Sequence, residues 1–166
     1  IQEHFGKLKG VKIAYVGDGN NVAASLAFAA AHFGMHFTIA SPEGYEMNPV
    51  VRDKIFEIAD KNESTVDMYV RPEEAVADAD VVYTDTWVSM GQEAEAEERR
   101  KEFKDFQVNA NLLGYTHSDC IVMHCLPAHR GDEITDEIMD GKQSKVFEQA
   151  ENRLHAQKAI LVHLLS

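Results

Sequence analysis

The sequence predicts an α/β protein with a doubly wound, mainly parallel, Rossmann-like sheet and helices on both faces. Short apolar segments alternate with longer segments of helical period, as in repeated strand–helix–strand units. Most of the apolar segments lack the polar alternation of a half-exposed strand, which suits a sheet covered on both sides. A length of 166 residues is enough for one domain with its own core.

The expected strands are short and rich in valine, isoleucine and aromatic residues. We place them at residues 11–16, 35–40, 65–70, 81–84 and 121–123. Helices are expected at residues 20–33, 49–62, 93–106 and 150–165, with shorter helical segments starting near 71 and around 108–115.

Side-chain patterns predict which face of each helix is buried. The first helix is alanine-rich and ends at Gly34; its expected inner face is Val22, Leu26, Ala29, Ala30 and Phe33. Pro49 is well placed to open the second helix, whose expected inner stripe is Val51, Ile55, Ile58 and Ala59. The charged run at residues 93–101 predicts a solvent-facing helix, with Glu95–Arg99 and Glu97–Lys101 as pairs one turn apart.

The charge balance limits the partners. Lysine and arginine number 16 against 28 aspartate and glutamate, a net charge of −12. Binding to nucleic-acid phosphates needs a basic stripe, which this chain lacks. Anionic membrane surfaces repel a protein with a net negative charge. Residues 22–40 are apolar but interrupted by serine, histidine and glycine, and residues 1–10 lack the apolar segment of a secretory signal. We therefore expect a cytoplasmic protein with no nucleic-acid or membrane partner.

Three side-chain-rich segments follow predicted strands directly: residues 17–21, 85–91 and 124–127. Ligands of open α/β sheets bind outside the carboxyl ends of the strands, so all three segments are expected at one edge. The first segment contains a Gly-x-Gly pattern, but Val22 stands where a dinucleotide fingerprint has a small residue. A helix cap by Asn20 and a ligand-binding amide on Asn21 both remain open.

In the second segment, Asp85 ends a buried strand, where a carboxylate needs a cation or several donors. It either caps a local turn or serves as the counter-ion of an ammonium group. In the second case the Ser89 hydroxyl and the Met90 backbone N–H become donors for a carboxylate. Trp87 is expected to pack rather than to contact a ligand.

In the third segment, Cys125 lies at the ligand edge, about 16 Å along the strand from Cys120 and beyond disulfide reach. Either a buried inert thiol or a functional one fits this position. His124, Cys125 and His129 lack the ligand spacing and fourth partner of a zinc site, so we expect no metal. His124 points to the opposite face from Cys125, which makes it a poor base for the thiol.

Taken together, these segments resemble the ornithine carbamoyltransferases. Asp85-x-x-x-Ser89-Met90-Gly91 is similar to the family's ornithine loop, and His124-Cys125-Leu126-Pro127 to its cysteine motif. Residues 17–21 and 150–153 match in the expected order. The similarity covers essentially the whole chain but only the carboxyl-terminal half of the family's enzyme. The Ser-Met-Gly loop is specific, because aspartate and putrescine carbamoyltransferases differ there.

The resemblance implies that the complete enzyme transfers a carbamoyl group from carbamoyl phosphate to L-ornithine, giving citrulline and phosphate in arginine metabolism. It implies ornithine binding by Asn21, Asp85, Ser89 and Met90, and carbamoyl phosphate contacts by Cys125, Leu126 and Arg153. Cys125 and Asp85 are the implied catalytic residues, with no cofactor.

The same resemblance makes residues 1–10 an interdomain connector and residues 11–166 the ornithine-binding domain. The family's phosphate-gripping Ser-x-Arg-Thr and His-Pro-x-Gln segments do not occur in these 166 residues, so the chain alone is expected to be inactive. The full-length enzyme is expected to be built on a homotrimer. A free-standing amino-acid-binding module and an NAD-dependent oxidoreductase remain as alternatives.

Overall fold

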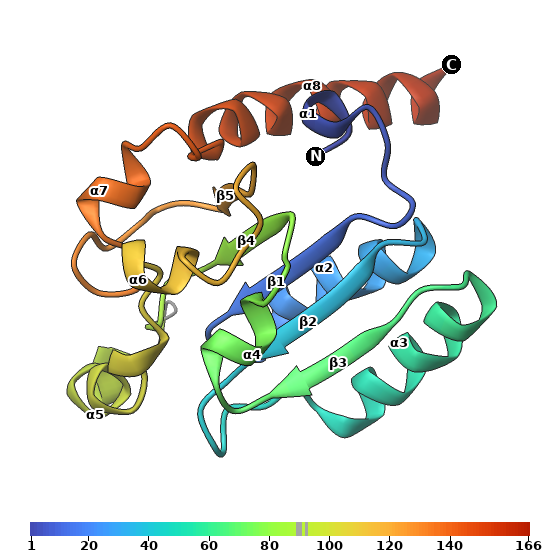
Figure 1. Ribbon diagram of the computed structural model, residues 1–166. Coiled ribbons are helices and arrows are strands. Elements are labelled where there is room, and N and C mark those ends of the chain that lie inside the picture. The colour runs from blue at the N-terminus through green and yellow to red at the C-terminus, as the bar shows by residue number, and fades with distance from the viewer. Residues whose placement is uncertain (89–90, 92) are drawn as a thin grey trace.

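The computed structural model describes residues 1–88, 91 and 93–166, which form a five-stranded sheet. The order is β3-β2-β1-β4-β5 and all neighbouring strands pair in parallel (Figure 1). The strands are β1 (Lys12–Val16), β2 (His36–Ala40), β3 (Val66–Tyr69), β4 (Val81–Thr84) and β5 (Ile121–His124). The direction of strand addition reverses beside β1, so the predicted doubly wound, Rossmann-like sheet is confirmed.

Helices cover both faces of this sheet (Figure 1). The α-helices are α1 (Gln2–Phe5), α2 (Asn21–His32), α3 (Pro49–Lys61), α4 (Pro72–Val76), α5 (Ala96–Glu102), α6 (Ala110–Leu113), α7 (Asp136–Met139) and α8 (Val146–Leu165). Two 3-10 turns, η1 (Glu93–Glu95) and η2 (Lys104–Phe106), flank α5. Helices α2 and α3 lie on one face, and α4 and α6 on the other.

The sheet separates two apolar cores. Along β1, Ile13 and Tyr15 pack with α2 and α3, whereas Ala14 and Val16 pack with α4 and α6. All four are fully buried, as expected of alternate residues in a strand covered on both sides.

The buried face of α2 differs from the prediction. The residues in the core are Ala23, Ala27, Ala30 and Ala31. Of the expected face only Ala30 is buried, and Phe33 is 57% exposed. Methyl side chains let the helix lie close to the sheet, while Val22 and Leu26 are only partly buried against the same core. In α3, by contrast, Ile55 and Ala59 are buried as predicted.

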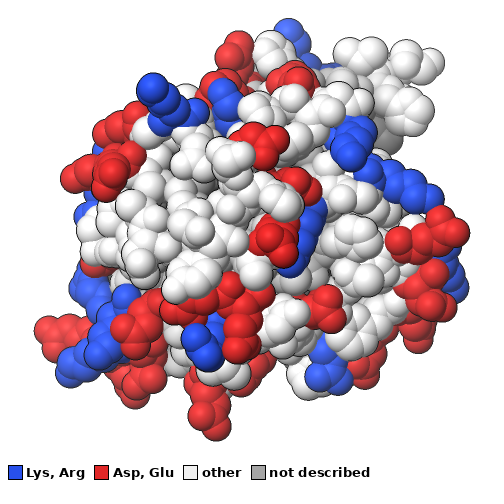
Figure 2. All heavy atoms as spheres, in the orientation of Figure 1, with Lys and Arg blue, Asp and Glu red and all other residues white. Residues whose placement is uncertain are grey.

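The charged segment is not one helix at 93–106 but η1, α5 and η2 in succession. Arg99, expected in solvent, is 3% exposed. The last helix begins at Val146, four residues before its predicted start, and residues 153–166 are all exposed. Figure 2 shows uncharged surface at this outer end of α8, at the upper right. None of the described helices is long and apolar enough to cross a membrane.

Candidate active site

The three segments predicted to meet do meet, at the carboxyl edge of the sheet. A cavity of about 720 Å³ is lined by residues from each of them and from α8. The predicted site residues along its wall are Asn21, Asp85, Cys125, Leu126 and Arg153. Ser89 and Met90 lie outside the described residues.

The turn after β1 places Asn21 at the cavity. The Asn20 side chain accepts hydrogen bonds from the N–H groups of Val22 (2.9 Å) and Ala23 (3.2 Å), so Asn20 caps α2, which is one of the two roles left open for this turn. A Cβ on Gly19 would lie 2.2 Å from the Met47 nitrogen. In a dinucleotide-binding fold the pyrophosphate lies against such a glycine; here the backbone at Met47 occupies that space. Asn21, the first residue of α2, is exposed and lines the cavity.

Asp85 follows β4 and is 7% exposed. Its Oδ1 accepts hydrogen bonds from the Thr86 N–H at 2.8 Å and from the Cys125 thiol at 2.9 Å. Its Oδ2 has a long contact of 3.5 Å with the Asn20 amide. One oxygen therefore holds the local turn, and the other is the side of the carboxylate available to a cation. The two roles left open by the sequence are compatible.

The Cys125 thiol is a donor in this arrangement. Burial, and then the hydrogen bond to Asp85, raise its pKa to about 12. Because this pKa lies well above neutral pH, the thiol is protonated at pH 7. Tyr15 and Tyr83 stack nearby with ring centroids 5.8 Å apart, and burial and the neighbouring acids raise the pKa of both phenols. The resting site thus presents Cys125 as a neutral S–H group, not as a thiolate nucleophile.

Arg99 on α5 supports the site from behind the cavity wall, and sequence reasoning missed it. Its guanidinium contacts the Asp18 carboxylate, and its Nε donates to the Trp87 carbonyl at 2.6 Å. It lies over the ring of Tyr45, 4.8 Å from the centroid. Burial raises the pKa of Asp18, and Arg99 opposes this shift. Arg99 therefore ties the segment after β4 to the turn after β1. Phe103, one turn further along and 5.3 Å from the guanidinium, was the available signal for a buried face.

Trp87 packs as predicted, although it also lines the cavity, and His124 is directed away from Cys125 as predicted. Trp87 is 4% exposed and packs against Phe103 with ring centroids 6.0 Å apart. The His124 ring is buried and directed at Glu133, with Nε2 and Oε1 3.2 Å apart, while Cys125 is directed at Asp85. Among the described residues no group of three or more histidine, cysteine, aspartate or glutamate side chains is arranged to hold a metal ion.

Arg153 reaches the cavity from α8. The helix is fixed one turn earlier by Gln149, which accepts from the His124 N–H at 3.1 Å and donates to the Tyr83 hydroxyl at 2.9 Å. Because α8 begins at Val146, Arg153 is in its interior and does not open it. The exposed guanidinium is thus a cation at the end of the cavity where Leu126 also lies.

Comparison with known proteins places these residues in a family. Residues 9–164 match the model described as aspartate/ornithine carbamoyltransferase, Asp/Orn binding domain. The chain belongs to this carbamoyltransferase family. An ornithine carbamoyltransferase of Archaeoglobus fulgidus is 56% identical over 99% of this chain and 52% of its own length. One of Anoxybacillus flavithermus is 54% identical over 99% of this chain and 52% of its own.

The fold agrees with solved members of the carbamoyltransferase family. The ornithine carbamoyltransferase from Pyrococcus furiosus superposes with a TM-score of 0.93 at 53% identity, over 97% of this chain and 51% of that one. The chain spans about half the length of the curated relatives it matches. Its part of the carbamoyltransferase is the Asp/Orn-binding domain, as the sequence motifs predicted.

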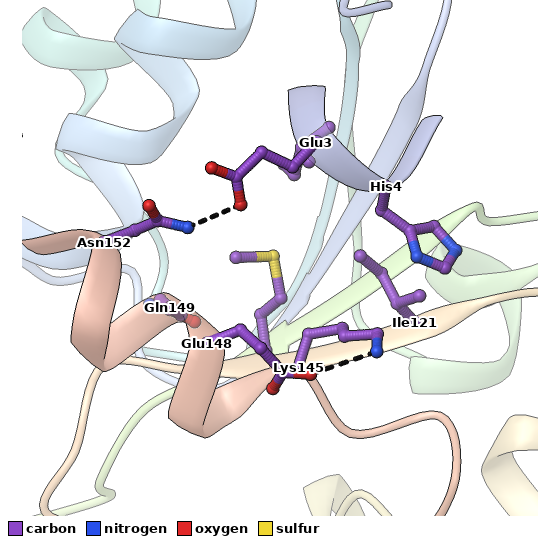
Figure 3. A pocket seen from close by; sticks show the side chains of 9 residues that line it. Glu3, His4, Ile121, Lys145, Glu148, Gln149 and Asn152 are labelled. Carbon is purple, nitrogen blue, oxygen red and sulfur yellow. Dashed lines mark hydrogen bonds and ion pairs between the residues drawn. The ribbon is translucent and has the colours of Figure 1, made fainter. Parts of the chain in front are cut away.

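A second cavity, of about 300 Å³, lies between α1, β5 and α8 (Figure 3). Four of its polar side chains already pair with one another: the Asn152 amide donates to Glu3 at 2.8 Å, and Lys145 contacts Glu148 at 3.1 Å. The larger cavity, where Asp85 and Arg153 present charge of opposite sign, is the better candidate for the functional site.

Proposed function

We propose that this chain is the ornithine-binding half of an ornithine carbamoyltransferase, with residues 11–166 as the ornithine domain and residues 1–10 as the connector. The complete enzyme converts carbamoyl phosphate and L-ornithine into L-citrulline and phosphate. The observation that carries the proposal is the 2.9 Å contact between Asp85 and the Cys125 thiol inside the cavity. It leaves one carboxylate oxygen for an ammonium group.

In this proposal Asn21, Asp85, Ser89 and Met90 bind ornithine. The side-chain ammonium of ornithine has an unperturbed pKa of about 10, so it must lose a proton before its nitrogen attacks the carbamoyl carbon. Asp85 and Cys125 are the groups placed to orient that amine, and the Asp85 carboxylate is the one of the two that can accept its proton. Because the thiol stays protonated, Cys125 acts by hydrogen bonding and forms no covalent intermediate.

The carbamoyl side of the site is proposed to be Cys125, Leu126 and Arg153. The Arg153 guanidinium at this end of the cavity would stabilise negative charge that develops on the carbamoyl oxygen. The remaining anion contacts belong to the family's amino-terminal half. We further propose that the complete enzyme is cytoplasmic and forms a homotrimer; light scattering of the full-length gene product would test the trimer.

The full-length gene product is expected to form citrulline from ornithine and carbamoyl phosphate, and the 166-residue chain alone is not. Asp85→Asn and Cys125→Ala should each lower turnover of the full-length protein by about 100-fold or more. Asp67→Asn, on an exposed carboxylate of β3, is the matched control and should keep normal turnover. Absence of citrulline with the full-length protein would refute the proposed activity, and near-normal turnover of Asp85→Asn would refute its role.

A further inference from the structure

A buried pair of side chains lies directly behind the Leu126 backbone. The His124 Nδ1 accepts a hydrogen bond from the Leu126 N–H at 2.8 Å. A ring nitrogen that accepts is unprotonated, so the proton of the neutral ring is on Nε2, which faces Glu133 Oε1 at 3.2 Å. Both side chains are 0% exposed. His124 is therefore fixed in one tautomer and one orientation by the Glu133 carboxylate.

Leu126 needs such support. Its φ angle is +58°, in the left-handed region that costs a residue with a Cβ about 1–2 kcal/mol. Such a strained conformation persists only where the surrounding structure holds it, and His124 supplies a hydrogen-bond acceptor for the Leu126 N–H.

Glu133 also reaches the other side of the cavity. Its Oε1 accepts a second hydrogen bond, from the His129 N–H at 2.5 Å. The His129 Nδ1 is 3.0 Å from the hydroxyl of Thr86, the neighbour of Asp85. One buried carboxylate thus connects the segment that carries Leu126 with the segment that carries Asp85.

We propose that His124, oriented by Glu133, is a positioning residue that holds the Leu126 backbone in its left-handed conformation and so places the carbamoyl group for transfer. This inference rests on the proposed function, in which Leu126 faces the carbamoyl group. Asp85 keeps its own contacts with Thr86 and Cys125, so ornithine binding depends less on this pair than turnover does.

Two substitutions at one position separate positioning from mere filling of a buried site. In His124→Asn the amide lies where Nδ1 was, so an acceptor for the Leu126 N–H is retained while contact with Glu133 is lost. In His124→Gln the amide lies where Nε2 was, so contact with Glu133 is retained and the acceptor is lost. If His124 only filled the buried site, the two variants would have the same kcat, or the larger glutamine would give the higher kcat.

The experiment uses the full-length gene product and two readouts, steady-state kinetics and hydrogen exchange at the Leu126 amide resolved by mass spectrometry. We expect His124→Gln to lower kcat by about 10–100-fold, with the KM for ornithine within about threefold of normal. Its Leu126 amide should exchange at least about tenfold faster. His124→Asn should keep the amide protected and recover most of kcat. Glu133→Gln should give a kcat and a Leu126 amide exchange rate between those of the two His124 variants. It replaces His124→Gln in the comparison if that variant does not fold.

Equal effects of the asparagine and glutamine variants, or unchanged protection of the Leu126 amide in His124→Gln, would overturn the inference. If the unsubstituted protein makes no citrulline, the proposed function fails, and the amide measurement still decides whether His124 holds Leu126.

Discussion

Arg99→Met tests how the segment after β4 is held in place. The Arg99 side chain is 4% exposed and contacts the Asp18 carboxylate and the Trp87 carbonyl. Methionine keeps an apolar chain against Tyr45 and Phe103 but removes the charge and every donor. Asp18, whose side chain is 14% exposed, is left without its cation.

Loss of one partner from a buried ion pair costs about 3–5 kcal/mol, because a desolvated charge remains. The whole free energy of unfolding of a domain is about 5–15 kcal/mol, so this is a large fraction. With a urea dependence of about 2 kcal/mol per molar, the unfolding midpoint should fall by about 1.5–2.5 M. Urea unfolding followed by far-ultraviolet circular dichroism measures this directly.

Arg100→Met is the matched control on the same helix. Its ion pair with Asp132, at 2.9 Å, joins side chains that are 50% and 32% exposed, and such a pair is worth less than about 1 kcal/mol. If Arg99→Met were no more destabilising than Arg100→Met, the proposed importance of the buried pair would be refuted.

The effect of Arg99→Met should also depend on pH. Burial already raises the pKa of Asp18 in the folded state, and loss of Arg99 removes what opposed the shift. An acid whose folded-state pKa is raised opposes folding while ionised, and that cost is relieved as the pH falls through the raised pKa. The stability deficit should therefore shrink as the pH is lowered from 7 toward about 4. A deficit independent of pH would contradict this origin.

Two further predictions concern the thiol and the core. Because the pKa of Cys125 is raised to about 12 from 9.0, its iodoacetamide labelling at pH 7.5 should be about 1,000-fold slower than that of an ordinary thiol. Asp85→Asn should lower that pKa and speed labelling; slower or unchanged labelling would contradict the Asp85 contact. Ile55→Ala on α3 should cost about 2–5 kcal/mol in urea unfolding, whereas Val50→Ala, at a 66% exposed position, should cost under about 0.5 kcal/mol; similar costs would contradict the assigned face.

The strands and their common carboxyl edge were predictable because apolar β-branched runs and strand-end positions are local properties of the sequence. The face of α2 was not, because an alanine-rich helix offers several similar apolar stripes. Ala23 and Ala27 are small enough to pack closely against the sheet and are buried, whereas Phe33 is exposed.

Within the site, the predicted residues that follow strands were found together, because strand order fixes where strand ends lie. The contacts that depend on loop paths were missed. Arg99 and Asp18 are separated by 81 residues, and His124 and Glu133 by nine residues of irregular chain. No sequence periodicity links such partners. A charged side chain is predicted to be solvent-exposed unless the counter-ion that allows its burial is known.

The exposed outer end of α8 has a thermodynamic consequence. From residue 153 onward every side chain is exposed, with Leu161 56% and Leu164 71% exposed, so tertiary packing adds little to helix formation there. A free helical segment of that length is marginal in water. Its backbone amides should therefore open by local fraying while the sheet stays folded. Binding of any surface to these leucines would also order the helix end, and the entropy lost in that ordering opposes binding. The affinity of such a surface will therefore be weaker than the buried area alone suggests.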